Sequence, residues 1–192
     1  MSLLKQAKTL SKRQIALTIA LIEQTRYPTR NVVIFLLSVK AGLRAKEIAS
    51  LTWDMLTDAE GNLGPSTHLR DEASKGRSGR IIPLNKDLKG ALQMLHDNRS
   101  SSPYVIATER AQQTSPAAIV NLFAHWYRLS GLNGCSSHSG RRTFITNAAR
   151  SISIVGGSLR DVQMLAGHRA LSTTQRYIKA DATAQKRVVD LV

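Results

Sequence analysis

Apolar residues recur at helical spacing over most of the chain. After Ser11, a residue type that caps helices well, isoleucines three or four residues apart share one helix face. Residues 32–37 are apolar on all sides instead, which is typical of a helix buried in the core. Ser115 and Pro116 form a cap-and-proline signal that starts a helix. These patterns predict helices over residues 12–24, 29–40, 87–98, 115–130, 138–150 and 159–166, a helical turn over 172–177 and a terminal helix over 180–192.

The helical period disappears between residues 53 and 84. Two segments rich in turn-forming residues, 58–62 and 75–79, separate short extended stretches, and residues 80–84 have the composition of a strand. We therefore predict a small antiparallel three-stranded sheet. Because no linker or internal repeat is visible, we expect residues 1–192 to form a single α+β domain that is mainly α-helical.

The charge of the chain points to a polyanionic partner. There are 27 Lys and Arg residues against 13 Asp and Glu residues, which gives a formal net charge of +14. Each phosphate that such a surface neutralises releases counterions, so nucleic acid is the favoured partner. A ribosomal-type or merely basic protein is the alternative. With 192 residues and 42% hydrophobic content, the chain is large enough to bury a proper core.

Several other classes of protein are disfavoured. The single cysteine, Cys135, excludes an internal disulfide and a cysteine-based zinc site, and the five histidines show no metal-ligand spacing. We therefore expect no metal and no other cofactor. The chain has no apolar run of about twenty residues that could span a membrane, and no secretory signal. We expect a cytoplasmic protein without a membrane partner.

Side chains suited to phosphate chemistry gather in the last third of the chain. His138 and Arg141 lie at the start of one predicted helix, and His168 precedes Tyr177 by nine residues. Cleaving a phosphodiester requires a nucleophile, neutralisation of the developing charge and a proton for the leaving oxygen. Arginine suits the second task because its planar fork binds two phosphate oxygens. Taken alone, a tyrosine near a C-terminus is usually a core or surface residue.

An earlier motif can extend this set. Arg44 and Glu47 are three residues apart, so on a helix they share a face and can pair. An isolated Arg-x-x-Glu is more often an ordinary surface ion pair. In the same way, the basic turn at residues 75–79 is by itself most simply a solvated turn.

Together these motifs resemble the catalytic domain of the tyrosine recombinases, the phage-integrase family. The segments that carry the resemblance are Gly42–Ile48 followed by Leu-Thr-Trp, His138–Phe144, and Gly167-His168 with Tyr177 beyond it. They occur in the family's order and extend over the whole chain. Counting back from Ile82-Pro83-Leu84 places Lys75 on the hairpin lysine that reaches into the active site of the family.

The resemblance implies a tyrosine recombinase catalytic-domain fold and a site-specific recombinase. The tyrosine would attack DNA and hold it as a 3′-phosphotyrosine ester, and a 5′-hydroxyl of the partner duplex would then rejoin it through a Holliday junction. The two arginines would neutralise the phosphate, the lysine would supply the leaving-group proton, the histidines would donate hydrogen bonds or protons, and the glutamate would support the first arginine. Neither ATP nor a metal would be needed. The catalytic residues implied in this way are Arg44, Glu47, Lys75, His138, Arg141, His168 and Tyr177.

The same resemblance implies double-stranded DNA as partner and a homo-tetramer on DNA, with residues 180–192 docking on a neighbouring protomer as a C-terminal oligomerisation helix. Two positions depart from the family. Many members have histidine where this chain has Arg142, and leucine where it has Gly140. The family also carries a separate helical DNA-clamping, core-binding domain before the catalytic one, which we expect to be absent here.

Two other functions remain open. One is a truncated integrase that binds DNA without cutting it, although a pure binder has no need for Tyr177. The other is a nicking-closing enzyme similar to type IB topoisomerases, which use a similar set of residues. The small size of the chain and the Ser-Thr-Thr-Gln-Arg-Tyr context favour the recombinase.

Overall fold

The computed structural model describes residues 7–74, 78–99, 101–109, 111–178 and 189–190. This part of the chain is mainly helical, as predicted, with one small antiparallel sheet. In chain order its elements are α1 (Lys12–Glu23), α2 (Pro28–Ala41), α3 (Ala45–Ala49), the 3-10 helix η1 (Trp53–Met55), β1 (Ser66–Leu69), β2 (Arg80–Pro83), α4 (Lys86–Asp97), α5 (Pro116–Leu129), α6 (Ser139–Ser151), the 3-10 helix η2 (Ile152–Val155), α7 (Leu159–Ala166) and α8 (Leu171–Gln175).

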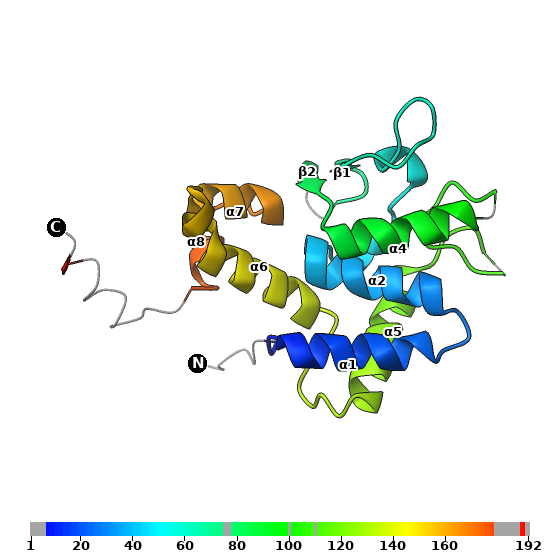
Figure 1. The fold of residues 1–192 in the computed structure, drawn as a ribbon, viewed down its shortest axis with the longest axis horizontal. Coiled ribbons are helices and arrows are strands. Elements are labelled where there is room, and N and C mark those ends of the chain that lie inside the picture. The colour runs from blue at the N-terminus through cyan, green and yellow to red at the C-terminus, as the bar shows by residue number, and fades with distance from the viewer. Residues whose placement is uncertain (1–6, 75–77, 100, 110, 179–188, 191–192) are drawn as a thin grey trace.

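Helix α2 forms the centre of the larger core. In Figure 1 it lies between α1 and α4 and passes in front of α5. Most of the apolar run that predicted a buried helix is indeed buried: Val33, Ile34 and Phe35 are all 0% exposed, and only Val32 is partly exposed. The Phe35 ring packs against the rings of Phe123 and Trp126 of α5, with centroids 6.2 and 6.4 Å away. Trp126 is thus a core residue.

The sheet contains two strands, so the prediction of three was wrong for the part of the chain that is described. β1 pairs with β2 in antiparallel register, with Thr67 opposite Ile82. The expected third strand is reduced to one bridge between Thr57 and Leu63. Asp58 is the reason: its backbone N–H donates to the carbonyl of residue 62, and its carboxylate accepts from the N–H of the same residue. These bonds close a turn directly after the bridge.

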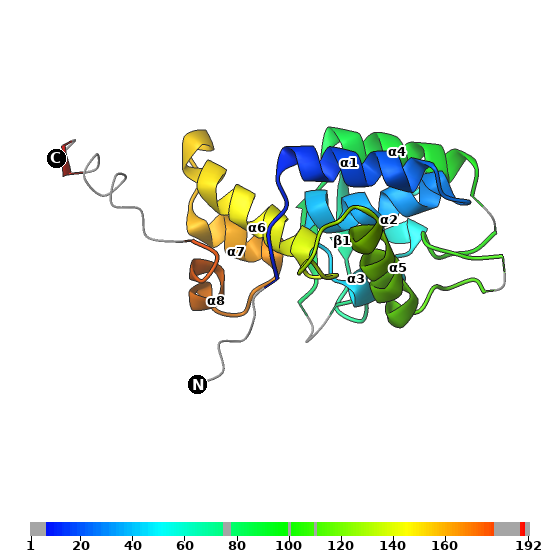
Figure 2. The same cartoon turned by 90° about the horizontal axis from the view of Figure 1, so that it is seen from below.

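A smaller hydrophobic cluster lies between α6 and α7. Buried Ile145, Val162 and Ala166 form its centre, and Phe144 and Tyr177 pack against it partly buried. In Figures 1 and 2, α6 runs from the larger core to α7 and α8, which lie together at one end of the molecule. Helix α6 therefore leads from the larger core to the smaller cluster and carries residues of the smaller one, among them Phe144 and Ile145.

Two glycines allow α6 to approach α2 closely. A Cβ atom on Gly140 would lie 2.3 Å from the Ser38 hydroxyl oxygen, so the leucine common at this position in the family has no space here. Gly42 ends α2 with φ +66°, and a Cβ there would lie 2.5 Å from Phe144. The close crossing brings the segment after α2 next to the first turn of α6.

The C-terminal prediction concerns residues that are mostly not described. Of the helix expected over 180–192, the structure describes only residues 189 and 190. Within the described part of the chain, no helix is both long enough and apolar enough to cross a membrane.

Candidate active site

A buried carboxylate organises the first half of the site. Glu47 is 0% exposed, and its two oxygens accept hydrogen bonds from the backbone and guanidinium of Arg44 at 2.8 Å and from the guanidinium of Arg80 at 3.1 Å. Burial favours the neutral acid, but the hydrogen bonds and charge of Arg80, followed by those of Arg44, outweigh it and lower the pKa of Glu47 below its usual value. Arg44 and Glu47 therefore do pair, but Glu47 is buried, so the pair is not an ordinary surface ion pair.

Arg80 had not been singled out in the sequence, although it contributes to the same cluster. Its Nε donates to the carbonyl of Leu165 at 2.9 Å, and its side chain is only 5% exposed. The residue therefore joins β2 to α3, through Glu47, and to the end of α7. One sequence signal could have pointed to it: Arg80 is the first residue of the strand that follows the basic turn.

Arg141 lies in the first turn of α6 and points into the crossing with α2. It is 4% exposed, and its guanidinium donates to the carbonyls of Gly42 at 2.6 Å and Ala166 at 2.5 Å. Burial, together with the positive charge of Arg44, lowers the pKa of Arg141 to about 9. Two of its five N–H donors are used by these carbonyls, so others remain for a ligand.

His168 follows the left-handed Gly167 that ends α7. Its Nδ1 lies 2.9 Å from the hydroxyl of Thr174 in α8, and the side-chain amide of buried Gln163 donates to its carbonyl at 2.9 Å. Burial and the positive charge of Arg141 lower the pKa of His168 to about 4. The imidazole is therefore neutral at pH 7 in the absence of an anion.

Tyr177 lies in the turn after α8, where its backbone N–H donates to the carbonyl of Thr174 at 3.0 Å. Its ring stacks on the ring of His168, with centroids 5.7 Å apart and an interplanar angle of 25°. The guanidinium carbon of Arg142 lies 5.5 Å from the centroid of the same ring. Arg142 had been noted only as a departure from the family.

One open pocket of about 480 Å³ collects most of the predicted residues. His138, at the N-cap of α6, is exposed at its rim. Glu47 is not part of the wall but lies behind Arg44. Lys75 is outside the described residues. The predicted residues that line the pocket are Arg44, His138, Arg141, His168 and Tyr177.

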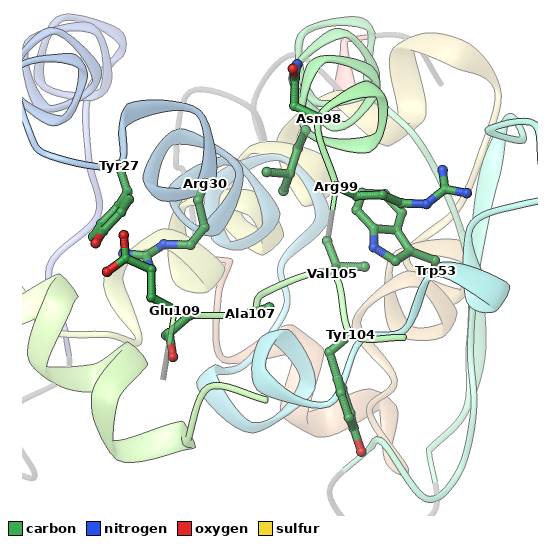
Figure 3. A pocket seen from close by; sticks show the side chains of 11 residues that line it. Tyr27, Arg30, Trp53, Asn98, Arg99, Tyr104, Val105, Ala107 and Glu109 are labelled. Atoms are coloured by element: carbon green, nitrogen blue, oxygen red, sulfur yellow. The ribbon is translucent and has the colours of Figure 1, made fainter. Parts of the chain in front are cut away.

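A second pocket, of about 260 Å³, is separate from the candidate site (Figure 3). It lies between the start of α2, the end of α4 and residues 104–109, and Tyr27, Trp53 and Tyr104 are among its lining residues. It shares no lining residue with the first pocket and contains none of the predicted site residues. The described part of the chain contains no group of three or more His, Cys, Asp or Glu side chains arranged to hold a metal ion.

The first pocket thus combines cations, hydrogen-bond donors and one phenol, a set that suits a phosphodiester. Comparison with known proteins agrees with this class. A sequence profile of the phage integrase family matches residues 8–184. The chain therefore belongs to the phage integrase family.

Relatives and solved structures agree with this assignment. The chain is 29% identical over 174 residues to tyrosine recombinase XerC of Pelobacter propionicus, a match covering 88% of this chain and 53% of the relative. It is 32% identical over 147 residues to tyrosine recombinase XerD of Pasteurella multocida, covering 71% and 45%. The crystal structure of XerA recombinase superimposes with a TM-score of 0.73 at 21% identity, covering 95% of this chain and 64% of that one, which shows a common fold. The chain thus spans about half the length of these curated relatives.

Proposed function

We propose that the chain is the catalytic domain of a site-specific DNA recombinase that cleaves and rejoins strands through a 3′-phosphotyrosine. The observation that carries the proposal is the convergence of Arg44, Arg141, His168 and Tyr177 on one pocket, from four separate places in the chain. Two arginines can bind the non-bridging oxygens of one phosphate while the phenol faces the phosphorus, and the neutral imidazole of His168 lies against the phenol ring.

In the cleavage step, the phenol oxygen of Tyr177 attacks the phosphorus and forms a P–O bond. The bond from phosphorus to the 5′ oxygen breaks, the electron pair goes to that oxygen, and a proton must reach it. We assign this proton to Lys75, by its place in the family motif. The phenol proton passes to a neutral base, and we assign this role to His168, whose ring stacks on the ring of Tyr177.

The arginines contribute most where negative charge develops. Burial destabilises the charged form of Arg141, and a phosphate in contact with it would compensate for that cost. A bidentate guanidinium also orients the phosphate for in-line attack. Glu47, which is itself bound by Arg80, holds Arg44 from behind, so the clamp is preorganised before DNA binds.

Rejoining reverses the step with a new nucleophile. A 5′-hydroxyl from the partner duplex attacks the phosphotyrosine, so the energy of the ester is conserved and neither ATP nor a metal is required. Exchange of two strand pairs through a Holliday junction implies a tetramer on DNA. We assign a docking role in that tetramer to residues 180–192.

The net charge of +14 and the proteins of similar fold support DNA as the partner. One such structure is XerH site-specific recombinase bound to its difH substrate, which superimposes with a TM-score of 0.75 at 17% identity, covering 98% of this chain and 55% of that one. Another is the Tn1549 transposon integrase in complex with transposon right end DNA, with a TM-score of 0.75 at 17% identity, covering 94% and 64%.

The proposal is tested by trapping the covalent intermediate. Supercoiled plasmid DNA is incubated with the protein and analysed on a denaturing gel, and the attached 3′ ends are sequenced to map the site. We expect an adduct with the wild type and none with Tyr177→Phe. Tyr104→Phe is the matched control, because it removes the same hydroxyl from a residue in the other pocket.

Other results would change the assignment. Salt-sensitive DNA binding without any adduct would indicate a binding module. A protein that forms the adduct and relaxes the plasmid, but exchanges no strands between two duplexes that carry the mapped site, would be a nicking-closing enzyme.

A further inference from the structure

Arg142 is a cation next to the candidate nucleophile. It follows Arg141 on α6, and since consecutive helix residues are about 100° apart around the axis, the two side chains point in different directions. Arg141 is directed into the crossing with α2, where it contacts Gly42. Arg142 faces Tyr177 instead, with its guanidinium carbon 5.5 Å from the ring centroid.

The charge of Arg142 is not neutralised within the described part of the chain. Its guanidinium forms no ion pair with the described carboxylates, and it lines the same pocket as Arg44, Arg141 and His168. Its contact with the Tyr177 ring is therefore not weakened by a competing anion. A cation is attracted to the face of an aromatic ring, and the attraction grows where water is partly excluded.

Another contact of the Tyr177 ring comes from a fixed group. His168 stacks on the ring, and its own Nδ1 is tied to Thr174 at 2.9 Å. The Tyr177 ring itself is only half-buried, in a turn beyond the last residue of α8. A side chain in such a turn needs side-chain contacts to keep one orientation. The smaller hydrophobic cluster, His168 and Arg142 supply them, and of these only Arg142 carries a charge.

We propose that Arg142 is a positioning residue for Tyr177, which holds the ring of the nucleophile toward the phosphate site. The inference rests on the proposed function, in which Tyr177 attacks DNA. Misplacement of a reacting group by about 1 Å can lower a rate about 100-fold. Loss of Arg142 should therefore lower the rate of cleavage by bound protein more than it lowers the affinity for DNA.

The experiment compares Arg142→Gln and Arg142→Lys in single-turnover cleavage of a duplex that carries the mapped site. Rates are measured at saturating DNA, and Kd is measured separately. For Arg142→Gln we expect a rate at least about tenfold lower and a Kd changed by less than about threefold. Arg142→Lys, which keeps a cation, should recover most of the rate. Arg150→Gln is the matched control, an exposed arginine at the other end of α6.

A second measurement does not depend on cleavage. The ring carbon resonances of Tyr177 in the free protein, assigned with Tyr177→Phe, should shift in Arg142→Gln and stay in place in Arg150→Gln. Tyr177 resonances that are unchanged in Arg142→Gln would overturn the proposed contact, whatever the cleavage rate of the variant.

The outcomes separate the two proposals. A wild type that forms no adduct rejects the recombinase function, and with it the role of Arg142. A wild type that cleaves, with Arg142→Gln equally fast, rejects only the positioning role. A lysine variant that cleaves no faster than the glutamine variant would also overturn the positioning role, since the residue would then act through its shape and not through its charge.

Discussion

At the scale of single residues, the candidate site depends on a carboxylate that solvent does not reach. Glu47 binds Arg44, which lines the pocket, and Arg80, which lies behind it. Each arginine is held on Glu47 by charge-assisted hydrogen bonds, the stronger class of such bonds. The position of Arg44 in the pocket is thus set by a group that does not itself face the ligand.

Removing that charge should destabilise the fold. Glu47→Gln keeps the shape but leaves Arg80, with a side chain 5% exposed, without a counterion. Breaking a buried pair in this way typically costs about 3–5 kcal/mol of unfolding free energy. Urea unfolding measures the loss, with exposed Glu60→Gln as the control that should leave the midpoint unchanged. An unaltered midpoint in Glu47→Gln would mean that the buried cluster contributes nothing to stability.

His168 makes stability depend on pH in a definite window. Its pKa in the folded protein is about 4, against about 6.5 in the unfolded chain, so between these values the unfolded state binds more protons. The free energy of unfolding should therefore decrease as pH falls from about 6.5 to about 4. Unfolding curves across this window check the slope, which His168→Gln should reduce. If the slope is the same in the variant, other groups cause it.

At the scale of elements, the site exists because α6 crosses α2 at short distance. Gly140 faces Ser38 and Gly42 faces Phe144, and a methyl group has no space at either glycine. The crossing lets Arg141 reach the carbonyl of Gly42, 99 residues earlier in the chain. The packing of α6 on α2 therefore sets the position of Arg141 in the pocket.

A methyl group at Gly42 should disturb both. Gly42→Ala combines left-handed strain, at φ +66°, with a Cβ 2.5 Å from Phe144. We expect a loss of about 2–5 kcal/mol, the sum of the two usual costs. Gly131→Ala is the matched control, because Gly131 has the same φ and nothing within 4 Å of its Cβ position, so it carries the strain alone. Thermal unfolding compares the two, and equal losses would show that the contact with Phe144 is unimportant.

At the scale of the whole molecule, the net charge of +14 and residues 180–192 concern the assembly of protomers on DNA. Residues 180–192 include apolar Val188, Val189, Leu191 and Val192 in an otherwise polar stretch. Deletion of everything after Lys179 should abolish assembly on DNA, because the docking contacts are lost, while the basic surface still binds single sites. Sedimentation of the complex on a duplex with the mapped site measures this. Unchanged assembly after the deletion would remove the docking role of the segment.

The sequence predicted the helices well and the sheet less well. The buried helix around Phe35 and the cap-and-proline start at Ser115 were confirmed, because helix formation depends on spacing and capping within a few residues. The third strand was wrong because pairing at Thr57 depends on the turn that Asp58 closes, and turn geometry is poorly specified by composition. For the site, the motifs identified five residues that line the pocket but missed Arg80 and Arg142.

By itself, the sequence determined the helices, the basic character and the family motifs. Helices and motifs depend on residues that are close together in the chain, and the charge depends on composition alone. Only the tertiary structure decided which side chains meet. The buried role of Glu47, the bond from Arg80 to the carbonyl of Leu165, 85 residues away, and the approach of Arg142 to the Tyr177 ring all join distant parts of the chain. Such contacts arise from the packing of α6 and α7 against α2 and β2, and local spacing carries no information about them.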